Sequence, residues 1–312
     1  MNRYFIAFLA LLGSLNVVAQ EDTSDVEAVR RMVSLSEVIV RSDLNVPRFL
    51  QRIKNDSSYY KAFKNLHILG YTSMNYIQMR DKKGRTIAKL ESKTRQHVAI
   101  GCRTMEILDE KITGDFYNRK KEYNYYTAEL YDAFFFTHGK VCGETNIVKG
   151  SAINPKGKKG LEKNQDQLKM LFFNPGKKVP GIPFIGDKLD VFDKDVAKFY
   201  DYSIDTAEMN GEACYIFTIN RKEGLSAFEK GRVVFDNITT WFNAKTMDIV
   251  GRNYDLSYSA GVYDFDVHMQ VEMTKVGDLI VPQILRYNGN WFRIDMGRER
   301  GIFTATLSNF TR

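Results

Sequence analysis

The sequence lacks the short motifs that mark the common enzyme classes. It contains no nucleophile elbow, no Walker phosphate-binding loop, no dinucleotide fingerprint and no paired-cysteine metal motif. Histidine, the usual acid–base residue near neutral pH, occurs only four times, as His67, His97, His138 and His268. We therefore expect a protein that is not an enzyme and that carries no cofactor.

Long apolar runs are also scarce. The most extended one covers residues 5–15, and it is too short to span a bilayer as a helix. Arg3 precedes this run and the small-residue stretch "VVA" follows it, which is the pattern of a secretory signal peptide cleaved near Ala19. Residue 20 is Gln rather than the Cys that a lipoprotein anchor needs. The pattern predicts an exported mature chain without a transmembrane helix.

Cysteine is limited to three residues, Cys102, Cys142 and Cys214. An oxidising compartment permits one disulfide among them. Cys214 lies in the strand-like segment "EACYIFTIN", where a small core residue is more common than a reactive thiol. The candidate disulfide therefore joins Cys102 and Cys142.

A thiol enzyme is the alternative interpretation of the same region. His138 stands four residues before Cys142, so on a helix the imidazole and the thiol would share a face, as a thiol nucleophile requires. Gly139 interrupts such a helix, which weakens this interpretation.

Charge is mildly basic, with 45 Lys and Arg against 38 Asp and Glu, a formal net charge of +7. The cations form short clusters such as residues 119–121 and 156–159. A surface of this kind favours solubility or contact with anionic lipid or polysaccharide. Export argues against nucleic acid as a partner.

The second half of the chain is strand-like from about residue 196 onward, with turn residues at short intervals. Close spacing predicts an antiparallel meander, because parallel neighbours need long crossover connections. The pair Asn288-Gly289 predicts a type I′ turn that joins the runs 281–287 and 290–295.

The first half is mixed. It predicts a short strand at 35–40, helices at 46–56, 57–66, 127–137 and 163–173, and a hairpin of two long strands at 67–79 and 85–98. We divide the mature chain into an N-terminal segment, 20–65, and one antiparallel sheet domain, 66–312. The sheet domain carries a helical and loop insertion at about 127–195, and its basic stretch 148–164 is a candidate mobile loop.

Residues 263–273 alternate in polarity, as a strand with one buried face does. Asp264, Asp266 and His268 share the polar face and raise the question of a metal site. Neighbours on one face of a strand lie roughly 6.6 Å apart, too far for one strand to surround an ion unaided. We expect no metal there. Four aspartates at 187, 190, 193 and 195 lack the spacing of an EF-hand and predict a solvated turn.

The apolar face of the same stretch continues onto the neighbouring strand, 252–258. The candidate ligand-binding residues on this aromatic-rich face are Tyr254, Leu256, Tyr258, Tyr263, Phe265, Val267, Met269 and Val271. Aromatic and Met residues on a sheet face also form ordinary core, so a filled core is the competing interpretation.

These elements predict an α+β fold that is mainly β, with a large curved antiparallel sheet whose apolar face is covered by a few helices. The order of signal peptide, early helices, long hairpin, helical interruption and final meander resembles the half-barrel fold of LolA-type periplasmic lipoprotein carriers. The segments 210–219 and 277–291 are similar to strand-turn-strand segments of such envelope proteins.

The resemblance implies an apolar cavity between sheet and helices that shelters acyl chains of a lipid or lipoprotein. It also implies a periplasmic or outer-membrane-associated location in a Gram-negative cell and an envelope protein as a possible partner. Two other classes stay open: a structural or interaction protein with a filled core, and an exported hydrolase or thiol enzyme.

Overall fold

The computed structural model describes residues 24–148, 161–179, 182, 185–260, 263–293 and 297–312. The predicted signal peptide and its cleavage site lie outside these residues, as does most of the loop expected at 148–164. Within the described part of the chain, no helix has both the length and the apolar character needed to cross a membrane.

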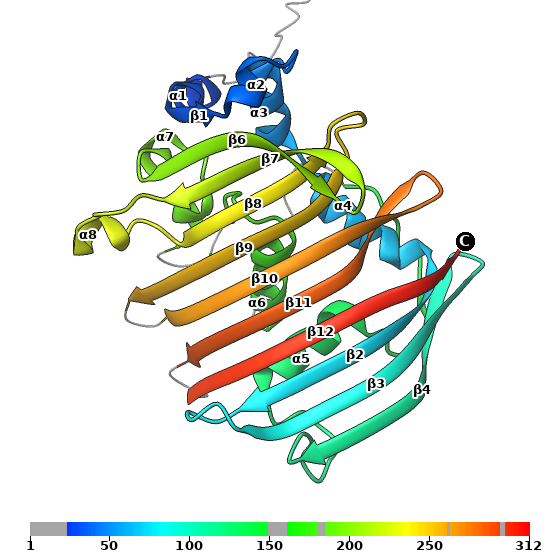
Figure 1. Cartoon of the computed structure of the whole chain (residues 1–312). Helices are drawn as coiled ribbons and strands as arrows, with labels where there is room; N and C mark the ends of the chain where they lie inside the picture. The colour runs from blue at the N-terminus through cyan, green and yellow to red at the C-terminus, as the bar shows by residue number, and fades with distance from the viewer. Residues whose placement is uncertain (1–23, 149–160, 180–181, 183–184, 261–262, 294–296) are drawn as a thin grey trace, which may run out of the picture.

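The chain forms short helices and long strands (Figure 1). The helices are α1 (Ser24–Met32), α2 (Glu37–Val40), α3 (Val46–Asn55), α4 (Ser58–Asn65), α5 (Tyr126–Phe135), α6 (Leu161–Phe173), α7 (Lys194–Ala197) and α8 (Ala227–Lys230), with 3-10 turns at Leu66–Ile68 and Gly186–Leu189. The strands are β1 (Val33–Leu35), β2 (Gly70–Arg80), β3 (Thr86–Ala99), β4 (Cys102–Gly114), β5 (Val141–Cys142), β6 (Tyr200–Met209), β7 (Glu212–Arg221), β8 (Phe235–Asn243), β9 (Ile249–Ala260), β10 (Tyr263–Val276), β11 (Leu279–Arg293) and β12 (Gly297–Thr311).

All described strands belong to one sheet, in the order β1-β6-β7-β8-β9-β10-β11-β12-β2-β3-β4-β5. Neighbours are antiparallel except β1, which pairs parallel to β6. The last strand, β12, pairs with β2, so the end of the meander meets the hairpin of the first half. Strands β2, β3 and β4 therefore extend the predicted meander beyond β12.

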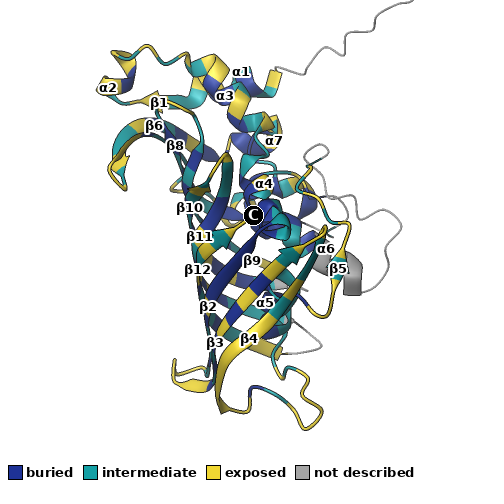
Figure 2. Cartoon of the chain, turned by 90° about the vertical axis from the view of Figure 1, so that its right-hand side faces the viewer, coloured by how far each residue is buried: buried dark blue, intermediate teal, exposed yellow. Residues whose placement is uncertain are grey.

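Helices cover one face of this curved sheet. Figures 1 and 2 show α4, α5 and α6 lying across the concave side, while no helix of the described chain lies over the opposite side of the central strands. α4 packs against β11, and α5 packs against β12 and α6. Burial of the apolar sheet face under these helices drives the arrangement. The predicted fold class, a mainly β α+β protein with a curved sheet and covering helices, is confirmed.

The predicted turn at Asn288-Gly289 is wrong. β11 runs through both residues, and Gly289 lies opposite Val267 of β10 and Gly301 of β12. A Cβ at position 289 would collide with the hydroxyl of Tyr287, which accepts a hydrogen bond from Trp291 Nε1 across the glycine. The glycine is thus needed for a side chain to lie over the strand, rather than for a turn.

Two smaller expectations also differ from the structure. The strand predicted at 35–40 ends at Leu35, and Glu37–Val40 form α2, whose first turn is capped by the hydroxyl of Ser36 accepting from Ile39 N at 3.4 Å. The edge strand β4 was not predicted at all, because its mixed polarity gives no clean alternation.

Candidate functional site

The predicted ligand-binding face is filled. Val267, Leu256 and Tyr254 are fully buried, and Phe265, Met269, Val271 and Tyr258 are at most 7% exposed. The side chain of Tyr263 lies outside the described part of the chain. The hydroxyl of Tyr254 donates to the carbonyl of Phe172 on α6 at 2.7 Å.

Little space remains between this face and the helices. The void bounded by Met269, Tyr287 and Phe303 has a volume of about 20 Å³. A void of that size holds about one water molecule and no acyl chain. The described residues of this face belong to the hydrophobic core.

Side chains on the polar face of β10 contact one another and the neighbouring strands. His268 Nδ1 lies 2.7 Å from Asp255 Oδ1 on β9, His268 Nε2 lies 3.5 Å from Asp266, and Asp264 pairs with Arg298 on β12. Across the residues that the structure describes, no group of three or more His, Cys, Asp or Glu side chains is placed to hold a metal.

The four aspartates near α7 take part in local contacts. Asp193 caps α7 by accepting from Asp195 N at 2.9 Å, and Asp190 Oδ1 accepts from Phe192 N at 3.1 Å. Asp187 pairs with Lys178 at 2.7 Å. These contacts account for the segment as the turn that the sequence predicts.

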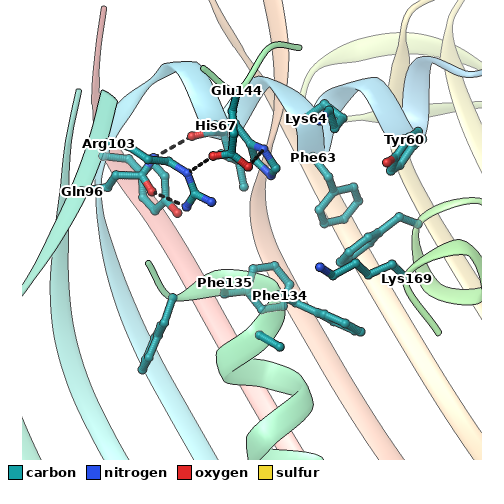
Figure 3. A pocket seen from close by; sticks show the side chains of 15 residues that line it. Tyr60, Phe63, Lys64, His67, Gln96, Arg103, Phe134, Phe135, Glu144 and Lys169 are labelled. Carbon is teal, nitrogen blue, oxygen red and sulfur yellow. Dashed lines mark hydrogen bonds and ion pairs between the residues drawn. The ribbon is translucent and has the colours of Figure 1, made fainter. Parts of the chain in front are cut away.

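A larger cavity lies further along the concave side, where α4, α5 and α6 face the strands β2 to β4 (Figure 3). Its volume is about 340 Å³, within the range of small-molecule sites. The lining residues are Tyr60, Phe63, Lys64, Leu66, His67, Tyr71, Gln96, Arg103, Ala133, Phe134, Phe135, Phe136, Glu144, Lys169 and Phe173.

One wall of the cavity is aromatic. Phe63 of α4 stacks on Phe173 of α6 with ring centroids 4.2 Å apart, and Phe134 and Phe135 of α5 meet the same Phe173 ring at 5.3 and 6.1 Å. Phe134, Phe135 and Phe173 also line the small void above Met269. These rings therefore separate the cavity from the filled centre of the sheet.

The opposite end of the cavity is polar. Arg103 donates hydrogen bonds to Glu144 and Thr137, and to Gln96 Oε1 at 3.3 Å. Gln96 Nε2 in turn donates to the carbonyls of Leu66 and Leu69, at 2.7 and 2.8 Å. This network joins β3, β4 and the segment after β5 to the 3-10 turn that follows α4.

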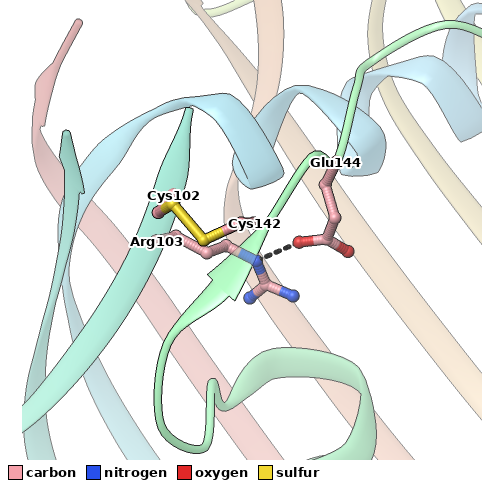
Figure 4. The surroundings of a disulfide bond; sticks show 4 residues. All are labelled: Cys102, Arg103, Cys142 and Glu144. Carbon is pink, nitrogen blue, oxygen red and sulfur yellow. Dashed lines mark hydrogen bonds and ion pairs between the residues drawn. A yellow bond between two sulfur atoms is a disulfide. The ribbon is translucent and has the colours of Figure 1, made fainter. Parts of the chain in front are cut away.

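A disulfide holds the two charged members of this network in place. Cys102 and Cys142 are bonded to each other, and they lie opposite one another at the start of β4 and in β5 (Figure 4). Arg103 is the next residue after Cys102, and Glu144 comes two residues after Cys142. The cross-link thus fixes the chain on both sides of the Arg103–Glu144 pair.

The bonded state of Cys142 bears on the thiol-enzyme interpretation. Its sulfur is shared with Cys102 and is not a free thiol. His138 Nε2 instead lies 2.6 Å from Asp132 Oδ2. The remaining cysteine, Cys214, is buried, and burial raises the pKa of its thiol.

His67 and Glu144 face each other in the cavity, with His67 Nδ1 2.9 Å from Glu144 Oε1. Burial lowers the pKa of His67 to about 4. The carboxylate of Glu144 raises this pKa, whereas the cations Arg103, Lys64 and Lys169 lower it further. Burial alone would raise the pKa of Glu144, but the hydrogen bond from Arg103 and the nearby positive charges outweigh it and leave that pKa lowered.

At neutral pH this leaves the imidazole neutral and the carboxylate charged. Among the lining residues, Lys64, Arg103 and Lys169 are then positive and Glu144 is negative. The three positive charges exceed the one negative charge by two. The cavity therefore combines aromatic rings with an excess of positive charge, and Lys169 Nζ lies over the Phe134 ring, 5.7 Å from its centroid (Figure 3).

None of these lining residues was among the predicted ligand-binding residues. The triple phenylalanine at 134–136 falls within a predicted helix, and Arg103 and Glu144 are ordinary charged residues in the sequence. The available signal was their position beside the two cysteines, since a disulfide fixes whatever stands next to it.

No protein-family model matches the sequence, and no curated protein is significantly similar to it. Among the solved structures that align with the chain, two cover most of it. A DUF1329 family protein from Desulfovibrio piger shares 11% identity over 82% of this chain and 92% of its own, with a TM-score of 0.23. A domain provisionally described as an outer membrane lipoprotein-sorting protein, from Vibrio parahaemolyticus, shares 6% identity over 83% of this chain and 92% of its own, with a TM-score of 0.25. Both TM-scores are below 0.5, so neither likeness bears on function.

Proposed function

We propose that this chain is an exported, non-enzymatic envelope protein that binds an amphipathic, negatively charged ligand, a lipid or a lipoprotein acyl chain, in the cavity beside the disulfide. The observation that carries the proposal is that this 340 Å³ cavity is lined both by phenylalanine rings and by an excess of positive charge. The signal-peptide pattern at the N-terminus supports export to the periplasmic space or outer membrane.

The aromatic wall suits the apolar part of such a ligand. Each Å² of apolar surface removed from water contributes about 25 cal/mol, so a hydrocarbon chain lying against Phe63, Phe134 and Phe173 gains most of its affinity there. Adjacent phenylalanine rings adapt to a flexible chain without polar groups that would need partners.

The positive charge of the cavity suits the head group. A carboxylate or a phosphate placed near Lys64 meets an excess of positive charge in a partly water-excluded site, where such attraction is stronger than in bulk water. Arg103 is already paired with Glu144, so it shapes the end of the cavity rather than supplying the main charge for the ligand.

The non-enzymatic part of the proposal is supported by the bonded state of Cys142, whose sulfur is not available as a nucleophile. The neutral His67 faces Glu144 and Arg103, with no hydroxyl nucleophile among the residues that line the cavity apart from the tyrosines Tyr60 and Tyr71.

The test is direct binding of a fluorescent fatty acid, together with mass spectrometry of lipid extracted from the purified mature protein. Ala133→Leu adds side-chain volume inside the cavity. It should lower the affinity for the probe by about tenfold or more while leaving the melting temperature nearly unchanged. Mass spectrometry of the extracted lipid distinguishes a carboxylate head group from a phosphate head group, because a fatty acid and a phospholipid differ in mass.

Charge is tested by a matched pair of variants on α4. Lys64→Glu reverses a charge in the cavity and should weaken the fatty acid probe, whereas Lys61→Glu reverses an exposed charge outside it and should not. Equal effects of the two variants would remove the head-group part of the proposal.

The filled centre of the sheet favours a second candidate, a structural or interaction protein that binds no lipid. Its supporting observation is the void of only about 20 Å³ above Met269. A purified protein that carries no extracted lipid and does not bind the fatty acid would select this candidate over the first.

A further inference from the structure

β4 is an edge strand along most of its length. β5 pairs only with Cys102 and Arg103, and across the residues that the structure describes nothing else pairs with that side of β4. The free edge therefore runs from Thr104 to the end of the strand (Figures 1 and 2). Ile107 is 58% exposed and Leu108 and Ile112 are each 38% exposed on it. A long edge with exposed apolar side chains is a template for another strand.

The backbone groups that point out of this edge follow from the pairing with β5. Gly143 N donates to Gly101 O at 3.1 Å, and antiparallel alternation then turns the N–H and C=O groups of Arg103, Met105 and Ile107 outward. Leu108 is an extra residue, because Ile107 lies opposite Thr94 whereas Asp109 lies opposite Lys93. This bulge shifts the alternation by one residue, so the outward groups beyond it belong to Glu110 and Ile112.

Only some registers allow this edge to pair with an antiparallel copy of itself, since each outward residue must face another outward residue. Placing Met105 opposite Ile112 of the second copy, and Ile107 opposite Glu110, meets that condition on both sides of the bulge. The paired stretch in this register is Thr104–Thr113, so each partner strand stops where β5 begins. The register thus uses the free edge except for its last residue, Gly114.

The side chains agree with the same register. It places Glu106 opposite Lys111 of the second copy, and two-fold symmetry produces this pair twice. Glu106 lies 3.0 Å from His97 within its own chain, and Lys111 forms no ion pair with any described residue of its own chain. Opposite charges facing each other across an antiparallel pair are stabilising. Met105 and Ile112 supply an apolar pair on the concave face.

We infer that two copies of this chain associate through their β4 edges, antiparallel about a two-fold axis between Leu108 and Asp109, and so join their sheets into one. The occupant of the edge is a second copy because length and backbone direction are self-complementary in one register, and the same register places Glu106 opposite Lys111 twice. This inference is independent of the proposed ligand.

The test measures self-association of the mature, disulfide-bonded protein by sedimentation velocity. An edge-to-edge contact is smaller than a standard interface, so we expect dimers at roughly 10–100 µM protein. Lys111→Glu places a second carboxylate opposite Glu106 and should raise the dissociation constant at least about tenfold. Lys93→Glu makes the same charge change one strand further in, on β3, and should leave the dimer intact.

Mixing two variants makes the test specific to the register. Glu106→Lys and Lys111→Glu should each be monomeric alone, and an equimolar mixture should form heterodimers because both facing pairs then have opposite charges. If Glu106→Lys does not fold beside Arg95 and His97, the comparison of Lys111→Glu with Lys93→Glu decides alone. A wild-type chain that stays monomeric at about 1 mM, or a Lys111→Glu variant that dimerises like wild type, would overturn the inference.

Discussion

The centre and the end of the concave face are covered by the same helices but packed in different ways. At the centre, α6 lies directly on β9 to β11, the rings of Tyr287 and Phe303 stack 4.5 Å apart, and a void of only about 20 Å³ remains. At the end, beside β2 to β4, a cavity of about 340 Å³ is left open. The difference is not in the number of aromatic rings, since both regions have several.

The inner face of the sheet changes in chemistry between the two regions. The inward face of β2 and β3 includes polar side chains beside apolar ones: Asn75 Nδ2 donates to Ser92 Oγ at 3.2 Å and to Thr94 Oγ1 at 3.3 Å, and Tyr131 Oη donates to Asn75 Oδ1 at 2.7 Å. Polar side chains must keep their partners and cannot collapse onto a neighbouring helix as aliphatic ones do. The cavity lies next to this hydrogen-bonded part of the sheet, at Tyr71, Gln96 and Arg103.

Removal of the disulfide is expected to have the largest effect and to act on the cavity end. The bond closes a loop with a sequence separation of 40 residues, for which chain entropy gives a stabilisation of about 2–4 kcal/mol. The double variant Cys102→Ser, Cys142→Ser should lose that much free energy of unfolding in urea titration. It should also lose fatty acid binding, because Arg103 and Glu144 are no longer fixed.

Cys214→Ser is the control for this prediction, because it removes a buried cysteine that forms no disulfide. It should retain probe binding. A double variant that binds the probe as tightly as wild type would show that the cross-link does not shape the cavity.

Overfilling the centre should come next in size. Val267 is fully buried, and an added ring there should cost about 1–3 kcal/mol, because a close-packed interior has no room for it. The variant Val267→Trp is therefore expected to melt at a lower temperature. Ala133→Leu, which adds volume in the open cavity, should change stability by less than about 0.5 kcal/mol.

The comparison fails if Val267→Trp keeps the wild-type melting temperature and blocks the fatty acid. That result would mean that the centre opens to admit a ligand, as the resemblance to LolA-type carriers implied for Phe265, Val267 and Met269.

The sequence predicts the centre of the molecule well for a physical reason. A strand with one buried face must alternate between apolar and polar residues. The pattern of residues 263–273 therefore predicts both the strand and the side chains that point inward. The same pattern cannot distinguish a filled core from an empty one, because that depends on where α6 lies. The helix is 90 residues away in sequence from the strand that it covers.

The cavity end is harder to predict from the sequence, because its strands do not alternate cleanly between polar and apolar residues. β4 has polar residues on both faces, and the inner face of β2 and β3 carries both polar and apolar side chains. Asn288-Gly289 misleads for a related reason, since glycine serves a turn and a close side-chain approach equally well. Pairing of Cys102 with Cys142 was predictable only because Cys214 lies in an evident strand.

The smallest expected effect is a pH dependence at the cavity end that the centre does not share. The pKa of His67 is about 4 in the folded chain against an ordinary value of 6.5, so the unfolded chain takes up a proton first as the pH falls. The folded state therefore loses stability between pH 6.5 and pH 4, by about 1–2 kcal/mol on going from pH 7.5 to pH 5. The lowered pKa of Glu144 acts below its usual value of 4.5, mostly outside this range.

His67→Gln should flatten this part of the stability profile, because glutamine fills similar space without taking up a proton. His268→Gln, at an exposed position on the polar face of β10, is the comparison variant, because it removes a histidine that lies outside the cavity. Urea unfolding at pH 7.5 and pH 5 measures both variants against wild type. If the slope persists in His67→Gln, the buried histidine is not its source, and the polar end of the cavity does not hold a neutral imidazole against Arg103 and Glu144.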